Sequence, residues 1–174
     1  MNARSRQTVL LKRGARAFTL VEILIVVVIL GILASIVIPQ FSNASLEARE
    51  NTLKDDLRYL RTQIGVYKAQ HHDVAPGVTG VGSGDFVQQL TMYTDDVGNV
   101  QATGDATYKF GPYLLRMPAN PLNSLESIKA STSADLTADV DDSTGWVYNA
   151  ATQQIIANKS GKDNNGTGTF YSKY

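Results

Sequence analysis

Glu22 is the only ionisable side chain in an apolar run of 21 residues, FTLVEILIVVVILGILASIVI, from Phe18 to Ile38. At about 1.5 Å per residue, a helix over this run spans roughly 30 Å, the thickness of the hydrocarbon core of a bilayer. A carboxylate in such a helix costs up to about 2.5–3.5 kcal/mol on insertion scales, and residues of this kind are usually functional. Glu22 is therefore the first candidate for chemistry in this chain.

The spacing of Glu22 from Phe18 suggests what that chemistry is. If the chain were cut just before Phe18, the new α-ammonium group would lie one helical turn from Glu22, at i and i+4 on the same face. Within one helix the amine would be repelled by the positive end of the helix macrodipole, whereas a staggered neighbouring helix could bring its own Glu22 to that amine. The pattern thus predicts a charge pair between two copies of the chain.

The charge balance before the apolar run predicts the orientation of this helix. The five basic residues of segment 1–17, which has no acidic residue, are Arg4, Arg6, Lys12, Arg13 and Arg16. The positive-inside rule places residues 1–17 in the cytoplasm and everything after Pro39 on the other side of the membrane. Without these five the chain has eleven basic and sixteen acidic residues, a net charge of −5. Nucleic-acid binding is therefore not expected.

Two simpler interpretations of the apolar run compete. An ordinary secretory signal would be cut at a small-x-small site such as Ser42-Asn43-Ala44, but its apolar region runs to about 7–15 residues, shorter than this one. A plain single-span anchor explains the length and the orientation of the run. Neither explains why a carboxylate stands near the start of the helix.

The segment Gly14-Ala-Arg-Ala-Phe-Thr-Leu-Val-Glu22, followed by ILIVVVILGILASIVIPQF, resembles the signature of type IV prepilins and type II secretion pseudopilins. The resemblance implies that a prepilin peptidase cuts between Ala17 and Phe18 and that the new amine of Phe18 is N-methylated. The family usually has Gly before the cut, where this chain has Ala17, which is also small. A cut after Gly14 would leave three residues ahead of Phe18 and would destroy the spacing to Glu22.

Gly31 and Pro39 lie eight residues apart in this helix. Glycine is a weak helix former, and proline removes one backbone hydrogen bond and clashes with the preceding turn, so a bend or a locally loosened helix is expected. The resemblance implies that the segment between them can unwind in assembled filaments. A simple kink is the alternative.

Beyond Pro39 the sequence becomes amphipathic and is expected to continue the helix to about His71. The apolar stripe, at spacings of three and four, consists of Leu53, Leu57, Leu60, Ile64 and Tyr67. The face opposite it is expected to be solvated or to meet neighbouring subunits, and it consists of Glu47, Arg49, Glu50, Lys54, Asp55, Asp56, Arg58 and Arg61. His71 and His72 are expected to be solvated at the end of the helix. We expect four parts: a leader (1–17), an assembly helix (18–39), its amphipathic half (40–73) and a globular domain (74–174).

The globular domain is expected to be small and mixed in structure. Residues 85–93 predict a short helix with Asp85 as N-cap, after a glycine-rich loop. The segment from Gly111 to Pro121 predicts a rigid crossing with apolar residues packed inward. Residues 146–149 and 154–157 predict a β-hairpin, with Gln153 where the family usually has Gly. The turn-rich end after Ser160 is expected to include a short edge strand. The predicted fold class is α+β, a long helix packed on a small antiparallel sheet, as in the pilin-like fold.

No residue set for catalysis stands out, and the chain is not expected to be an enzyme. It has no cysteine, and the adjacent His71 and His72 would diverge by about 100° on a helix. Asp139, Asp141 and Asp142 could offer oxygen ligands to calcium, but Gly145 is one position away from the EF-hand glycine and Ala150 replaces the bidentate Glu. We therefore expect a solvated acidic loop and no metal site, with calcium at this loop as the alternative.

The leading hypothesis is a pseudopilin of a type II secretion system, held in the inner membrane with its domain in the periplasm and assembled into a helical filament that drives protein export. The resemblance implies as partners further copies, minor pseudopilins, a prepilin peptidase and an inner-membrane platform with its ATPase. The absence of cysteine favours this hypothesis over a type IV pilus or DNA-uptake filament, whose major pilins usually carry a disulfide. A non-polymerising anchored binding module is the alternative from a different class, and a membrane-bound hydrolase lacks any residue set.

Overall fold

The computed structural model describes residues 18–164 and 168–174. The predicted leader, with Ala17, lies outside the described residues. The chain divides into two compact units, one ending at Phe41 and the other comprising Ser42–Tyr174.

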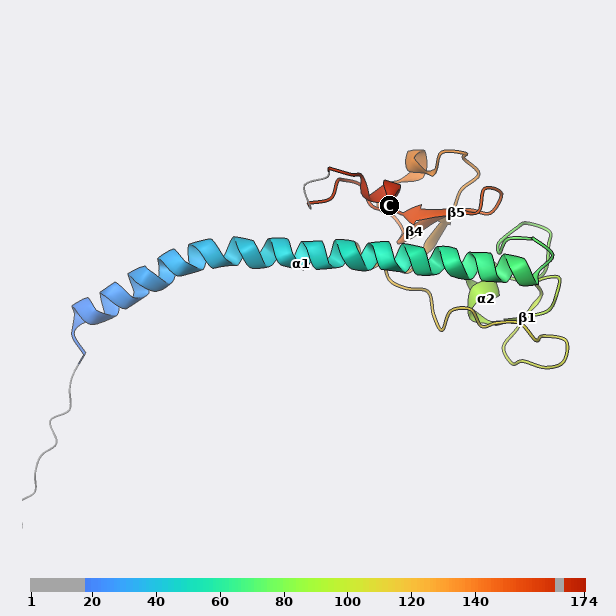
Figure 1. Ribbon diagram of the computed structural model, residues 1–174, viewed down its shortest axis with the longest axis horizontal. Coiled ribbons are helices and arrows are strands. Elements are labelled where there is room, and N and C mark those ends of the chain that lie inside the picture. Colours follow the sequence, from blue (N-terminus) through green and yellow to red (C-terminus); the bar gives the residue numbers. More distant parts are fainter. Residues whose placement is uncertain (1–17, 165–167) are drawn as a thin grey trace, which may run out of the picture. The chain divides into compact units, whose positions relative to one another are not determined.

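The predicted long helix is confirmed as α1, Leu20–Gln70 (Figure 1). Both Gly31 and Pro39 lie within α1, and the helix is assigned without interruption through both. The structure therefore shows no break of the helix at these residues, and the alternative that we expected there, a bend, stays a prediction. Proline at 39 still removes the N–H that would pair with the Ser35 carbonyl, and the Ser35 hydroxyl donates to the Ile32 carbonyl oxygen at 2.7 Å.

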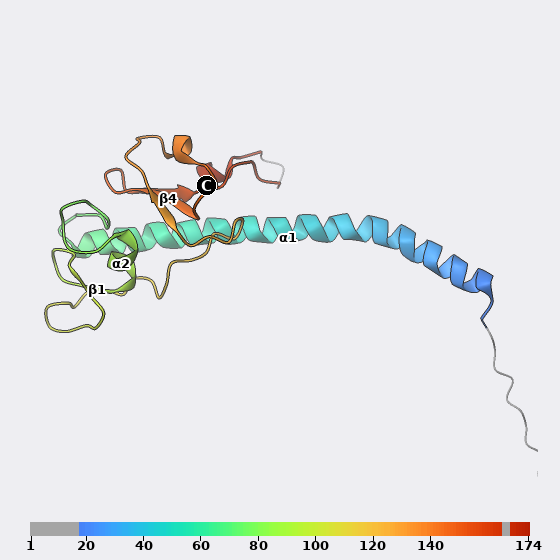
Figure 2. The same cartoon turned by 180° about the vertical axis from the view of Figure 1, so that it is seen from behind.

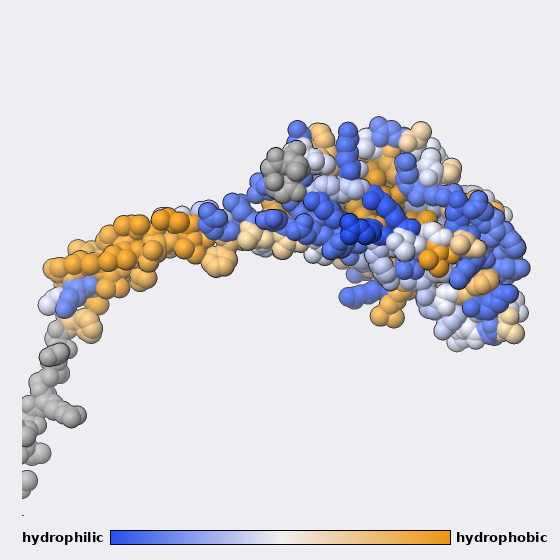
Figure 3. Space-filling view, in the orientation of Figure 1, coloured by the Kyte–Doolittle hydropathy of each residue, from blue (hydrophilic) through white to orange (hydrophobic). Residues whose placement is uncertain are grey.

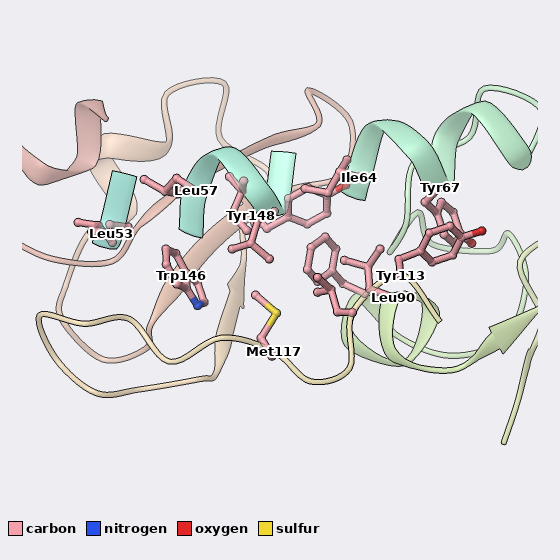
Figure 4. Close-up of a cluster of buried hydrophobic side chains, with 14 of the residues drawn as sticks. Leu53, Leu57, Ile64, Tyr67, Leu90, Tyr113, Met117, Trp146 and Tyr148 are labelled. Carbon is pink, nitrogen blue, oxygen red and sulfur yellow. The ribbon is translucent and has the colours of Figure 1, made fainter. Parts of the chain in front are cut away.

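The second half of α1 packs onto the core of the domain. All five residues of the predicted apolar stripe are buried, which confirms the 3.6-residue pattern. They meet Leu90, Tyr113, Met117, Trp146 and Tyr148 in one cluster (Figure 4). Complete burial of a leucine or aromatic side chain contributes about 1.5–3 kcal/mol relative to exposure. This cluster therefore fixes the helix to the domain.

Two small sheets complete the domain. Strands β1 (Tyr93–Thr94) and β2 (Val100–Gln101) pair antiparallel, and β3 (Ile128–Ala130), β4 (Trp146–Asn149) and β5 (Gln154–Ala157) form a sheet in the order β3-β4-β5. In both ribbon views the β4–β5 pair lies on one side of α1, and α2 with β1 lies on the other (Figures 1 and 2). The fold is therefore α+β and pilin-like, as predicted.

The predicted hairpin is confirmed as β4–β5. Its turn is held by Asn149, whose Oδ1 accepts the N–H groups of Ala151 and Thr152. Gln153 has φ 61°, a left-handed conformation that glycine adopts most readily. Glycine, which the resemblance implies at this position, would adopt this conformation without strain.

Strand β3 pairs parallel with β4, which the sequence did not indicate. A parallel pair needs a crossover connection of a dozen or more residues. Residues 131–145, with the short 3-10 helix η1 (Leu136–Asp139), provide it.

The predicted short helix is confirmed as α2, Phe86–Thr91, with Asp85 as its N-cap. Asp85 and Gln88 form a reciprocal capping box, which satisfies two free backbone donors. In the predicted crossing, Tyr113, Leu114 and Met117 are buried as expected, whereas Leu115 is exposed.

The prediction that Glu50 lies on a solvated face is wrong. Its side chain is 0% exposed, and its Oε1 accepts hydrogen bonds from the Asn164 N–H at 2.8 Å and the Tyr171 hydroxyl at 3.0 Å. Both donors belong to the C-terminal segment, which folds back onto α1. That segment contains the 3-10 helix η2 (Tyr171–Lys173) and a single antiparallel bridge between Lys162 and Phe170, where we expected an edge strand.

The prediction that His71 is solvated is also wrong. Its side chain is 2% exposed, its Nδ1 lies 2.7 Å from the Tyr67 carbonyl oxygen, and its Nε2 lies 3.0 Å from Thr94 Oγ1. The ring stacks on Tyr67 with 3.8 Å between centroids. His72 is exposed, as expected, with Nε2 4.0 Å from an Asp96 carboxylate oxygen.

Candidate assembly site

A capping box closes the tip of α1. Glu22 Oε2 accepts hydrogen bonds from the Thr19 N–H at 2.8 Å and the Thr19 hydroxyl at 2.9 Å, and Thr19 Oγ1 accepts the Glu22 N–H at 3.2 Å. Thr19 is thus the N-cap residue and Glu22 stands three residues into the helix. The sequence analysis missed Thr19, although the T-x-x-E spacing that marks a capping box is visible in the sequence.

The capping box uses only one oxygen of the Glu22 carboxylate. Both Thr19 donors converge on Oε2, and within residues 18–164 and 168–174 the Oε1 atom accepts no hydrogen bond. Each carboxylate oxygen has two lone pairs. Glu22 can therefore keep its capping role and still bind a positively charged partner through Oε1.

The helix that follows is bare on all sides. The large apolar side chains between Leu20 and Ile38 are half exposed or more, with Val37 slightly less so, and Figure 3 shows this stretch as hydrophobic on the face in view except for a small hydrophilic patch near its beginning. Among the described residues α1 is the one helix long and apolar enough to cross a membrane. Among the described residues of its own compact unit, this apolar surface has no packing partner.

Gly31 has open space around its Cα. Among the described residues, a Cβ added there would meet nothing within 4 Å, so alanine would fit. Packing among these residues therefore does not require glycine at position 31.

The predicted cleavage point falls at the edge of the described chain. Ala17 lies outside the described residues, whereas Phe18 is described and 81% exposed, directly before the capping residue Thr19. Cleavage between Ala17 and Phe18, and N-methylation of Phe18, stay predictions.

The acidic loop of the domain already has protein partners. Asp141 accepts hydrogen bonds from the Ser143 hydroxyl, the Asn158 amide and Lys129 Nζ, at 2.6, 2.9 and 3.0 Å, and these bonds hold its pKa well below the usual range. Asp142 pairs with Lys159 at 3.3 Å. Asp139 accepts a hydrogen bond from Ser131.

A calcium ion at this loop would have to displace Lys129 from Asp141 and Lys159 from Asp142. Within the part of the chain that the structure describes, no three His, Cys, Asp or Glu side chains are grouped so that they could hold a metal ion. Calcium binding stays a hypothesis on these residues.

The comparisons with known proteins point in one direction. The family described as "Prokaryotic N-terminal methylation motif" matches residues 12–38. Curated relatives include proteins named type II secretion system core protein G from several bacteria. The one from Klebsiella pneumoniae is 42% identical over 63% of this chain and 70% of its own length. The one from Dickeya chrysanthemi is 34% identical over 64% of this chain and 65% of its own. The one from Pseudomonas aeruginosa is 40% identical over 33% of this chain and 40% of its own.

The chain thus spans less than two thirds of the length of some of the relatives that it matches. No solved structure matches it.

The long helix has a bare apolar half that begins with the Thr19–Glu22 capping box, and its other half packs on a small mixed sheet. These features define a type IV pilin-like protein. Within that class, the chain belongs to the family of type II secretion system core protein G, the pseudopilins.

Proposed function

We propose that this chain is a structural subunit of a type II secretion pseudopilus. A prepilin peptidase cuts between Ala17 and Phe18, the new amine is methylated, and the subunit waits in the inner membrane with its domain in the periplasm. Assembly by an inner-membrane platform and its ATPase then stacks the bare halves of the helices into a filament. Minor pseudopilins share this filament, and the chain itself performs no covalent chemistry.

One observation supports this proposal most directly. The Glu22 carboxylate accepts both capping hydrogen bonds through Oε2, and its Oε1 accepts none from the described residues. In a membrane helix a carboxylate with an unused oxygen is costly. The methylated amine of Phe18 on a staggered neighbour would supply a cation to Oε1 and would set the register between subunits. Burial of the apolar half in a bundle would then hold the filament together.

The names of the relatives favour the secretion system over a pilus or DNA-uptake filament. A membrane-anchored binding module that never polymerises would use Glu22 only to cap its helix. The two roles of Glu22, capping and charge pairing, therefore need to be separated by experiment.

Glu22→Gln separates them, because glutamine forms the same capping box but carries no charge. We expect Glu22→Gln and Glu22→Ala both to remain in the membrane and to lose filament assembly by at least about tenfold, the effect of losing about 1.4 kcal/mol per contact. The measurement is filament yield in cells that assemble the wild type, with N-terminal mass spectrometry of the mature chain. Normal assembly of Glu22→Gln would reduce Glu22 to a cap and would refute the charge-pairing role.

A further inference from the structure

A second surface, at the tip of the C-terminal segment, is distinct from the helix tip. We call it the C-terminal tip, and it consists of Gly161–Asn164 and Gly168–Phe170. Lys162 and Phe170 face each other in an antiparallel bridge, and Lys162 Nζ lies 4.9 Å from the centre of the Phe170 ring. Lys162 is exposed and Phe170 is 46% exposed.

The acidic groups of this region point inward. Asp163 is buried and accepts hydrogen bonds from the Thr169 N–H and the Tyr174 hydroxyl, and Glu50 is held beneath the segment by Asn164 and Tyr171. Because neighbours along an extended chain alternate between faces, Lys162 and Phe170 point outward where Asp163 and Tyr171 point inward. The outer face of the tip therefore presents one cation and one aromatic ring and none of the nearby carboxylates.

The tip is tied to the beginning of the domain half of α1. Asn164 Nδ2 donates to Asn43 Oδ1 at 3.3 Å. Asn43 follows Ile38, the end of the apolar run, by five residues, which bounds their separation at about 18 Å. The headgroup layer on each side of a bilayer adds about 5–8 Å to the hydrocarbon core. The chain length thus limits how far Asn43, and the Asn164 side chain bonded to it, can lie from the end of the apolar run.

The charges on α1 next to the tip do not oppose a contact with the membrane surface. Glu47 and Arg49 are both exposed and offset each other. Lys162 therefore sets the sign of the charge that the tip presents. A lysine beside an aromatic ring suits the boundary between acyl chains and headgroups, where the ring is partly buried and the ammonium meets phosphate.

We propose that the C-terminal tip binds anionic phospholipid headgroups of the outer leaflet through Lys162 and Phe170, and holds the domain of the unassembled subunit against the membrane. This inference rests on the membrane anchorage proposed above and not on polymerisation. Extraction of a subunit into a filament would then have to break this contact.

The test uses the full chain with Phe170→Trp, reconstituted in phosphatidylcholine vesicles with roughly 30% phosphatidylglycerol. Part of the phosphatidylcholine carries bromine in its acyl chains. Trp146 is 0% exposed, so its emission gives a constant background. We expect bromine to quench the introduced tryptophan, and we expect Lys162→Glu to weaken that quenching about fivefold, since one lysine near an anionic surface is worth about 1 kcal/mol. Vesicles of phosphatidylcholine alone should show the same loss.

Lys109 provides a matched control, because its Nζ also lies over a phenylalanine ring, 5.1 Å from the centre of Phe110. Lys109→Glu should leave the quenching unchanged. Glu22→Ala should also leave it unchanged, which separates this inference from the filament. Amide exchange of Gly161–Asp163 in the chain with native Phe170 should slow in anionic vesicles, and this guards against misfolding of the tryptophan variant.

A chain that floats with the vesicles but shows no quenching, or equal quenching with Lys162→Glu, would overturn this inference and leave the filament proposal standing. A chain that does not float with vesicles at all would overturn the anchorage and this inference together.

Discussion

The two halves of α1 differ in how their apolar residues are distributed around the helix. From Leu20 to Ile38 apolar residues cover every side of the helix and none of the large ones is buried. From Leu53 to Tyr67 they occupy one stripe, and all of that stripe is buried against the domain. The second half has its packing partners within the domain, whereas the described residues of the first unit offer the first half none.

The carboxylates of Glu50 and Glu22, one in each half, differ in the same way. Glu50 uses Oε1 for two donors of its own domain and leaves Oε2 buried with no partner among the described residues. Glu22 uses Oε2 for two donors and leaves Oε1 at an exposed helix tip. A free oxygen in the interior is a cost to the fold, whereas a free oxygen at the tip is available for assembly.

The largest effect that we predict for a single substitution separates the halves by stability. Leu57→Ala should lower the free energy of unfolding of the domain by about 2–5 kcal/mol, because it opens a cavity in the core. Val27→Ala, in the bare half, should leave it unchanged. Urea unfolding followed by Trp146 fluorescence measures both. An equal loss in the two variants would mean that the bare half supports the domain.

Alkaline pH should also act on the domain alone. Burial raises the pKa of Tyr113 to about 12, and burial together with the hydrogen bond to Glu50 raises the pKa of Tyr171 to about 12. A pKa above the unfolded value of about 10 gives stability that is complete below pH 10 and lost as pH rises from 10 to 12.

We expect a loss of roughly 3–5 kcal/mol by pH 12 from these two tyrosines. The run from Phe18 to Phe41 contains no tyrosine, so its helix should persist through the same titration. Circular dichroism in a micelle, with Trp146 fluorescence for the domain, follows both. Parallel loss of the two signals would contradict the separation.

Thr19→Ala should cost about 1 kcal/mol at the tip of α1, the usual effect of a lost N-cap, while Thr19→Ser should keep the cap. Amide exchange of Glu22 and the residues beside it reports the fraying. Unfolding of the domain should be identical in both variants. Unchanged exchange in Thr19→Ala would show that the capping box does not hold the tip.

Gly31 and Gly65 form a matched pair, one in each half, since a Cβ at either position meets nothing within 4 Å. Alanine at either site should stabilise the helix by up to about 1 kcal/mol. Gly65→Ala should raise the stability of the domain and leave assembly intact, whereas Gly31→Ala should lower filament yield. Equal yields would show that neither helix flexibility nor close packing is needed at Gly31.

The smallest effect that we predict concerns calcium. Because Lys129 and Lys159 already pair with Asp141 and Asp142, any site there should be weak, with a Kd of about 1 mM. Saturation to one half would then add only about 0.4 kcal/mol to domain stability. Thermal unfolding with calcium or with chelator measures it, and Asp141→Asn should abolish it. A shift of many degrees would reveal a stronger site.

Much of the fold could be predicted because its signals are local. The stripe of α1, the N-cap Asp85 and the hairpin at Trp146 are each signalled by residues a few positions apart, and the structure confirms all three. Thr19 was within reach of the same reasoning, since its spacing to Glu22 is that of a capping box. It was missed because only a partner on another chain was considered for Glu22.

The remaining features depend on contacts between distant segments. Glu50 looks like a member of a charged surface, and only Tyr171, 121 residues away, shows that it is covered. His71 looks like a solvated helix end, and only Thr94 and Tyr67 show that it is part of the core. The parallel pairing of β3 with β4 likewise depends on where the crossover returns.

By itself, the sequence determined the apolar segment, its lone carboxylate, the amphipathic helix and the hairpin, because helices and strands are encoded by residues a few positions apart. Only the tertiary structure decided which charged groups are buried, as at Glu50. The reason is physical: burial and hydrogen bonding depend on which segments meet, and segments more than a hundred residues apart leave no periodic signal of their meeting.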